Sequence, residues 1–365
     1  MQIPQTFRIH RKWWALGAAA VAVVALVLVL IGGGREDPGP TTTLATGLES
    51  STSTSQTIPG ASSTSMPSDG PVEPVDRNPL TGAPLEGPSE LQVIAVKVGN
   101  SPGERPQMGL AEAGLVFETV LEGGLTRFLA LYFEGEPDTV GPVRSIRPVD
   151  AAVLAPFQPF FVFSGGQDFV YRLVTAAGIN LTDEAAGEAV YRGSGAAPYN
   201  LVVDFASARS LAIGRPPAAP VYQFAEGFSG DSASELDLTM GGARVQYRFE
   251  DGTGYVRMQD AAPFNVLSPS NDSEPFVRDT VIVQFVAQRS AGYADVKGAE
   301  VPDFDVIGFG EALIFHGGQV VPAEWRRASQ ASGTLFFGQA GEPLPLPIGS
   351  IIVELVPTGS EFSYR

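Results

Sequence analysis

The chain contains no cysteine and only two histidines, His10 and His316, in 365 residues. Without cysteine there are no thiol nucleophiles, thiolate zinc sites or disulfides, and no cysteine on which a lipid could be attached. A Ser-His-Asp site or a multi-histidine metal site would have to rest on His316. We therefore expect no metal and no cofactor, so any chemistry would use carboxylates, hydroxyls, Lys97 or oxygen-bound cations.

Lysine is also scarce, since Lys12, Lys97 and Lys297 stand against twenty arginines. The formal net charge is -17 and the pI is about 4.5. Binding to nucleic acid requires concentrated Lys and Arg to contact the phosphates. The composition therefore predicts no nucleic-acid partner, and its acidity is typical of a soluble surface.

Only one long apolar run is present, over residues 13–31, and a basic cluster at 8–12 precedes it. Nineteen helical residues would span roughly 28 Å, close to the hydrocarbon thickness of a bilayer. We predict a cytoplasmic segment over 1–12 and a transmembrane helix over 13–31 that contacts the membrane, with the rest extracytoplasmic. A cleaved signal peptide is the alternative, although such apolar cores usually run about 7–15 residues and end in an A-x-A-like site.

The amino-acid composition and the hydrophobic pattern change twice after this run. Residues 32–75 are rich in Gly, Pro, Ser and Thr and predict a disordered tether. Residues 76–215 mix strand and helix patterns, whereas 221–365 are almost entirely strand-like, and the Pro-rich stretch 214–220 is the expected domain boundary. The predicted fold class is α+β: a mixed α/β domain followed by a β-rich domain.

Individual elements can also be predicted. Helices are expected over 149–154 and 168–177. Strands are expected over 91–98, 115–121, 126–133, 159–163, 243–249, 254–258, 280–287, 311–315, 319–321, 333–337 and 351–355. Gly123-Gly124 predicts a two-residue hairpin turn, which would make Glu118 and Arg127 diagonal neighbours on one face.

The strongest candidate for a binding site is a group of arginines. Arg105, Arg127, Arg144 and Arg147 fall within a window of 43 residues that contains no lysine. Arginine suits bidentate contacts to carboxylate or phosphate, and prolines constrain the loop 141–148. The functional interpretation predicts that at least two of them converge on one concave surface. The alternative is that each pairs with a local acid.

Further candidates surround these arginines. Gly165 and Gly166, at a strand-to-helix transition, could offer backbone N–H groups to an anion, although an ordinary turn has the same pattern. Glu118, in an apolar strand, is either a core ion pair or a site residue. The predicted ligand-binding set is Lys97, Asn100, Arg105, Gln107, Glu118, Glu122, Thr126, Arg127, Arg144, Ser145, Arg147, Gly165 and Gly166.

Several short motifs occur in an order that resembles the YerB-like envelope lipoproteins of bacteria, a family defined as domain of unknown function 3048 with N- and C-terminal parts. The matching motifs lie at 78–82, 96–100, 105–110, 118–128, 141–148, 197–200, 255–257, 307–310 and 324–325. The resemblance implies an extracytoplasmic location and supplies no established reaction. Gly99 stands where the family usually has Asp, and 263–265 reads Pro-Phe-Asn where it tends to have His and Asp. Family members commonly anchor through a lipidated cysteine, which the apolar run replaces here.

Two functions remain open at this point. The first is a non-catalytic binding module of the cell envelope whose Arg/Gly block recognises an acidic cell-wall glycan, a peptide or an envelope protein. The alternative is a hydrolase or transferase acting on cell-wall material, with Glu118 or Glu122 as acid or base. The orientation of the two carboxylates should discriminate between them, because catalysis would need an open cleft.

Overall fold

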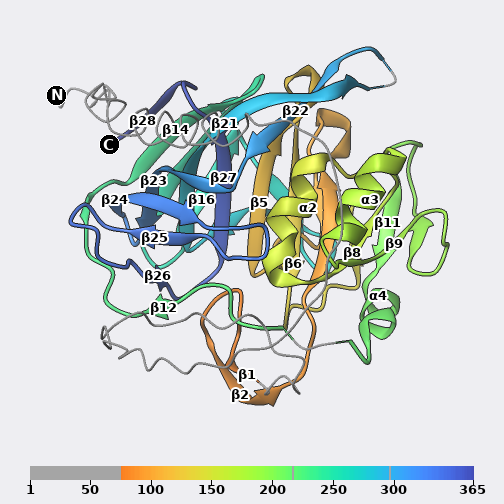
Figure 1. The fold of residues 1–365 in the computed structure, drawn as a ribbon, viewed down its shortest axis with the longest axis horizontal. Coiled ribbons are helices and arrows are strands. Elements are labelled where there is room, and N and C mark those ends of the chain that lie inside the picture. Colours follow the sequence, from red (N-terminus) through yellow and green to blue (C-terminus); the bar gives the residue numbers. More distant parts are fainter. Residues whose placement is uncertain (1–74, 216–217, 296) are drawn as a thin grey trace, which may run out of the picture. The chain divides into compact units, whose positions relative to one another are not determined.

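The computed structural model describes residues 75–215, 218–295 and 297–365, and a twelve-stranded sheet dominates this part of the chain (Figure 1). The predicted cytoplasmic segment, the predicted transmembrane helix and the predicted tether up to residue 74 lie outside the described residues. Among the residues that are described, no helix is both long and apolar enough to cross a membrane.

The large sheet combines strands from both sides of the predicted boundary at 214–220. Its order is β13-β24-β23-β21-β27-β5-β6-β3-β8-β9, with β22 added to β21 and β25 added to β24. The strands are β3 (Ile94–Gly99), β5 (Leu115–Val120), β6 (Thr126–Tyr132), β8 (Phe160–Phe163), β9 (Asn180–Asp183), β13 (Asp231–Ser232), β21 (Thr280–Ala294), β22 (Glu300–Asp305), β23 (Gly308–His316), β24 (Gln319–Arg327), β25 (Leu335–Phe337) and β27 (Ile351–Pro357).

Strand β27 joins the two halves, because it pairs in parallel with β21 on one side and with β5 on the other. Six of its seven residues are buried, as expected for a strand covered on both faces. The predicted boundary therefore marks a change of composition, while the sheet continues across it.

A six-stranded sheet covers one face of the large sheet. Its order is β17-β16-β15-β14-β28, with β20 paired to β16. The strands are β14 (Glu235–Met240), β15 (Ala243–Glu250), β16 (Gly254–Gln259), β17 (Ala262–Pro263), β20 (Val277–Arg278) and β28 (Phe362–Tyr364). Every second residue of β14 is buried, which is the alternation of a sheet with one covered face. We call the interface between these sheets the inter-sheet face.

Helices cover the opposite face of the large sheet, which we call the helix face (Figure 1). They are α2 (Pro148–Leu154) and α3 (Asp168–Ala176), with the 3-10 turns η1 (Pro102–Glu104), η2 (Glu122–Gly124) and η3 (Ala155–Phe157). Helix α4 (Phe205–Ala212) lies on the other face, because its Phe205 ring packs edge to face on Tyr132, which shares a face of β6 with Phe128 and hence with Arg257 of the six-stranded sheet. In the described part of the chain no helix follows α4. The predicted mixture of helix and strand in the first half and the β-rich second half are confirmed.

The remaining strands form four small sheets at the periphery. These are β1 (Val75–Arg77) with β2 (Pro84–Ser89); β7 (Thr139–Val140) with β11 (Leu201–Asp204) and β10 (Val190–Arg192); β12 (Phe224–Ala225) with β26 (Leu346–Pro347); and β4 (Gln107–Met108) with β18 (Asn265–Leu267) and β19 (Ser273–Pro275).

The hairpin between β5 and β6 differs from the prediction, and the difference determines which face of the sheet carries Arg127. The backbone N–H of Leu121 donates to the carbonyl of Leu125 at 2.7 Å, so the loop is longer than two residues. Thr119 lies opposite Arg127, one residue away from the predicted register. Because neighbouring residues of a strand face opposite ways, this shift moves Arg127 to the other face from Glu118. The predicted diagonal pair of Glu118 and Arg127 is therefore wrong.

Candidate functional site

The large sheet divides the predicted site residues between its two faces. Glu118 points to the inter-sheet face, where it forms an ion pair with Arg257 of β16. Lys97 points to the helix face, where it forms an ion pair with Asp150 of α2. The predicted set is therefore not one site, and the two groups are described separately.

On the inter-sheet face, Glu118, Glu354, Tyr247 and Arg257 form what we call the carboxylate cluster. Glu118 and Glu354 are neighbours on the parallel strands β5 and β27. Arg257 Nη1 lies 2.7 Å from Glu118 Oε2 and 2.8 Å from Glu354 Oε1, and it donates to the Tyr247 hydroxyl at 2.7 Å. Tyr247 in turn donates to Glu354. All four side chains are buried, so one guanidinium serves two carboxyl groups out of contact with solvent.

Burial raises the pKa of Glu354 well above its ordinary value, and the neighbouring Glu118 raises it further, while Arg257 acts in the opposite direction. The folded structure therefore favours the protonated form of Glu354 more than water does. The Arg257 guanidinium keeps a pKa above its usual value despite its burial, because Glu118, Tyr247 and Glu354 surround it.

This arrangement predicts a pH-dependent stability. The folded state holds the Glu354 proton more tightly than the unfolded state, so the free energy of unfolding falls as the pH rises from the ordinary pKa of Glu toward the folded pKa. Each pKa unit of difference corresponds to about 1.4 kcal/mol. Glu354→Gln stays neutral, and we expect it to lose less stability than wild type between pH 5 and pH 9 in urea unfolding. The control is Glu311→Gln, at an exposed position of β23. Parallel curves for wild type and Glu354→Gln would contradict the prediction.

A polar network extends the carboxylate cluster toward β4. Asn100 Nδ2 lies within hydrogen-bond distance of Glu118 Oε1 at 3.0 Å and of Thr126 Oγ1 at 2.8 Å. Arg105 Nε and Gln107 Nε2 donate to Asn100 Oδ1 at 2.9 and 3.2 Å. Five residues of the predicted ligand-binding set are therefore connected to one another by hydrogen bonds. These bonds attach the segment 100–107 to β5 and β6 of the large sheet.

The second group lies on the helix face and centres on the segment 144–147. The backbone N–H of Arg144 donates to the carbonyl of Lys97 in β3 at 2.9 Å, and that of Ile146 donates to Gly165, just after β8, at 2.9 Å. The segment is thus bonded on both sides, which holds its side chains in place.

Arg127, Arg144 and Arg147 gather at this segment, and we call them the arginine cluster. Arg147 pairs with Glu122 of η2, with 2.9 Å between Nε and Oε2, and Arg144 pairs with Glu104 of η1. Two of the three arginines therefore pair with a local acid, as the alternative interpretation predicted.

Arg127 is different. It donates from Nη1 to the backbone carbonyl of Ser145 at 2.7 Å and forms no ion pair with any described residue. Burial, and next the charge of Arg147, lower its pKa to about 10. Arg127 is thus a confined cation with no carboxylate in direct contact, and Glu122 and Glu104 act on its charge only from beyond ion-pair distance. An anionic ligand in contact with Arg127 would complete this environment.

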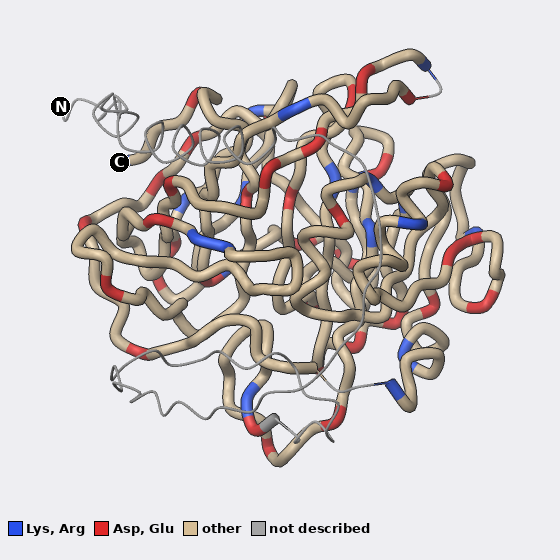
Figure 2. Tube along the Cα trace, in the orientation of Figure 1, with Lys and Arg blue, Asp and Glu red and all other residues tan. Residues whose placement is uncertain are grey.

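The charges of the rest of the molecule make this cluster a local exception. Figure 2 shows acidic residues spread over the described chain, in keeping with the net charge of -17. An anion approaching most of this surface would be repelled, so a favourable site requires cations gathered in one place.

Lys97 lies too deep to contact a ligand in this conformation. Its Nζ is 2.7 Å from Asp150 Oδ1, and neither side chain has exposed surface. Burial lowers the pKa of Lys97, whereas Asp150 opposes that shift. Asp150 also accepts a hydrogen bond from the backbone N–H of Arg147 at 2.8 Å, so the buried pair fixes the start of α2 and the end of the 144–147 segment.

Gly165 and Gly166, two residues of the predicted set, lie beside the segment 144–147 of the arginine cluster. Ser145 and Ser164 approach each other with 3.5 Å between their hydroxyl oxygens, next to Gly165. A Cβ on Gly166 would lie 2.5 Å from Ile146 Cγ1, so this glycine allows the loop to pack closely on the segment 144–147. Packing accounts for Gly166 without a ligand.

The family resemblance predicts an aspartate at the position of Gly99. In this chain the carboxylate of Glu104 lies beside Gly99 instead. A Cβ on Gly99 would lie 2.4 Å from Glu104 Cδ, so the Glu104 side chain occupies that space. Glu104 also accepts a hydrogen bond from the backbone N–H of Ser101 at 2.6 Å. An acid is thus present there, held against Arg144.

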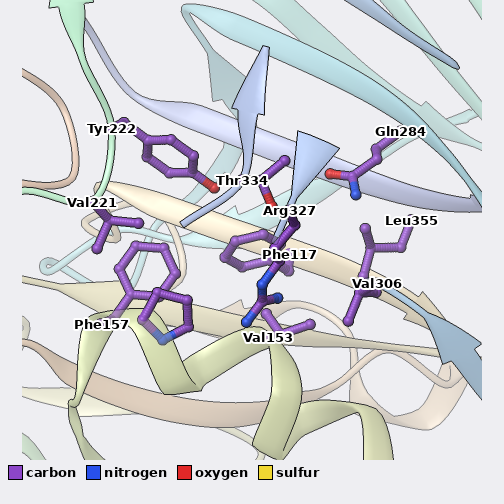
Figure 3. A pocket seen from close by; sticks show the side chains of 11 residues that line it. Phe117, Val153, Phe157, Val221, Tyr222, Gln284, Val306, Arg327, Thr334 and Leu355 are labelled. Atoms are coloured by element: carbon purple, nitrogen blue, oxygen red, sulfur yellow. The ribbon is translucent and has the colours of Figure 1, made fainter. Parts of the chain in front are cut away.

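A small pocket lies elsewhere on the helix face (Figure 3). It contains about 10 Å³ that the centre of a water molecule can occupy, which is room for about one water. Arg327 points into it but donates to backbone carbonyls, among them those of Ser332 at 2.8 Å and Ala152 near the end of α2. No residue of the predicted set lines this pocket.

Sequence reasoning missed the partners of Glu118, namely Arg257 and Glu354. Each stands alone as a charged residue in an apolar strand. That pattern signals a buried, paired charge, although it does not say which residues pair.

Comparisons with known proteins agree with this architecture. Residues 80–215 match the N-terminal domain model of "Protein of unknown function (DUF3048)", and residues 236–353 match its C-terminal domain model. A relative named "Putative lipoprotein YerB", from Bacillus subtilis (strain 168), is 24% identical over 294 residues, which cover 76% of this chain and 86% of the relative. The crystal structure of the YerB protein from Bacillus subtilis superposes with a TM-score of 0.67 at 23% identity, over 79% of this chain and 99% of that chain. At this identity the superposition demonstrates a common fold.

Proposed function

The chain belongs to the DUF3048 family, and from the site described above we propose that it is an envelope protein that binds an anionic ligand through the arginine cluster. The observation that carries the proposal is Arg127, a largely buried guanidinium that has a backbone carbonyl as its partner and no ion pair among the described residues. A carboxylate or phosphate would supply the missing partner.

The proposed location rests on two observations. The relative YerB is named as a lipoprotein, and the apolar run over 13–31 of this chain, with its basic flank, is typical of a membrane anchor. An anionic ligand outside the membrane could be a carboxylate-bearing glycan of the cell wall.

Acid-base catalysis by Glu118 or Glu122 has less support. Glu118 is fully buried and bonded to Arg257 and Asn100. Glu122 belongs to the other face, where it pairs with Arg147. The two carboxylates therefore do not face one open cleft, which was the arrangement that catalysis required.

The test is a titration of the full-length protein with N-acetylmuramic acid by calorimetry. We expect Arg127→Ala to weaken binding at least about ten-fold, because a hydrogen bond to a charged group contributes about 1.5–3 kcal/mol. Arg127→Lys should recover only part of the affinity, since an ammonium group lacks the planar fork of donors. The control is Arg192→Ala, which removes an exposed arginine of the same half. Unchanged affinity in Arg127→Ala would refute the proposal.

A further inference from the structure

An arm formed by β21 and β22 reaches past the large sheet toward the arginine cluster. The first part of β21 belongs to the sheet, whereas Ala287–Ala294 pairs only with β22 (Figure 1). Strand β22 contacts η2 and α2, the elements that carry Glu122 and Asp150. Val301 and Phe304 of β22 are buried, so apolar contacts fasten the arm there.

Tyr293 extends from this arm over the helix face. Ser290, Gly292 and Ala294 are exposed, whereas Tyr293 between them is half-buried, which is the alternation of a strand with one covered side. Its ring meets the ring of Phe169, in the first turn of α3, edge to face with 5.0 Å between centroids. The arm and α3 thus jointly present two aromatic rings.

The same tyrosine lies close to the arginine cluster. Burial raises the pKa of the Tyr293 hydroxyl, and the charge of Arg147 acts against that shift more strongly than any other group, followed by Glu122 in the opposite direction. A half-buried ring pair with a polar hydroxyl therefore borders the cations.

We infer that Tyr293 and Phe169 are specificity-determining residues of the arginine cluster, and that the ligand is an anionic sugar whose ring packs on them while its acidic group meets Arg127. The inference rests on the proposed function and adds the chemical class of the ligand. Binding sites typically combine aromatic surface with a few placed polar groups. An inorganic anion has no sugar ring to pack on the two aromatic rings, and a neutral sugar has no charge to pair with Arg127. A sugar acid satisfies both.

The experiment compares three probes with the full-length protein: N-acetylmuramic acid, lactate, which is its acidic substituent alone, and N-acetylglucosamine, which is the neutral sugar. We expect wild type to bind N-acetylmuramic acid about ten-fold more tightly than lactate, and N-acetylglucosamine more weakly than N-acetylmuramic acid. Tyr293→Ala and Phe169→Ala should each reduce the affinity for N-acetylmuramic acid about two- to twelve-fold and leave that for lactate unchanged, since an aromatic contact contributes about 0.5–1.5 kcal/mol.

Control variants distinguish the role of the two rings from the proposed anion binding by the arginine cluster. Tyr191→Ala removes an exposed tyrosine elsewhere and should change neither affinity. Unfolding midpoints equal to wild type would establish that the ring variants are folded. If lactate binds and Arg127→Ala abolishes its binding, but N-acetylmuramic acid binds no better than lactate or is unaffected by Tyr293→Ala, the role of the rings is overturned and the anion site stands. If neither acid binds wild type, both proposals fall.

Discussion

Replacing Arg257 with methionine is expected to lower the free energy of unfolding by about 3–5 kcal/mol, because it leaves the carboxyl groups of Glu118 and Glu354 buried without a cation. The same change removes the contact of the guanidinium with the Phe264 ring, which lies 4.8 Å away. Urea unfolding of the full-length protein, followed by tryptophan fluorescence, to which buried Trp325 contributes, measures the loss.

Two further variants identify the cause. Arg248→Met changes an exposed arginine on the neighbouring strand and should cost less than about 0.5 kcal/mol. The triple variant Arg257→Met, Glu118→Gln, Glu354→Gln should recover much of the loss, since no uncompensated charge remains. If Arg257→Met unfolds at the same urea concentration as Arg248→Met, the carboxylate cluster does not stabilise the junction of the two sheets.

A loss of similar size, about 3–5 kcal/mol, is expected for Lys97→Met. The substitution leaves the carboxylate of Asp150 without its ammonium partner in a place with no exposed surface. Asp150 retains the hydrogen bond from the Arg147 backbone N–H, so α2 should still form while the sheet beneath it loosens. Thermal and urea unfolding of the full-length protein report the change.

The chain provides a matched control for this prediction, because Lys297→Met makes the same substitution at an exposed position. It should leave stability within about 0.5 kcal/mol of wild type. The double variant Lys97→Met, Asp150→Asn should be less destabilised than the sum of the two single variants, since each single variant strands one charge. Strict additivity would mean that the ion pair contributes no coupling.

The elements of the fold were largely predictable because their signals are local. The apolar runs that form β5, β6 and β27 correspond to the predicted strands, and Pro148 followed by Asp150 begins α2 near the predicted start. The extent of β21 was not predictable in the same way, since its last residues pair only with β22 and are mostly exposed. Nothing in that polar stretch is typical of a buried strand.

The candidate site was predictable in its residue types and not in its grouping. Arginines beside glycines and prolines indicated a constrained loop at 141–148, and the backbone hydrogen bonds of Arg144 and Ile146 agree with that constraint. The partners of Glu118 could not be inferred, because Arg257 and Glu354 lie more than a hundred residues away along the chain. Pairing at such a separation depends on which strands become neighbours.

By itself the sequence determined α2, α3 and most strands of the large sheet, since hydrophobic periodicity, prolines and capping residues act over a few positions. It did not predict α4, β14 or β22. It also determined the family, through motifs that remain recognisable in order. Only the tertiary structure decided that one sheet joins both halves and that the candidate residues separate between its two faces. A single residue of register at the 121–125 loop placed Glu118 in the core and Arg127 beside the helices, because side chains alternate along a strand and the length of a loop sets that alternation.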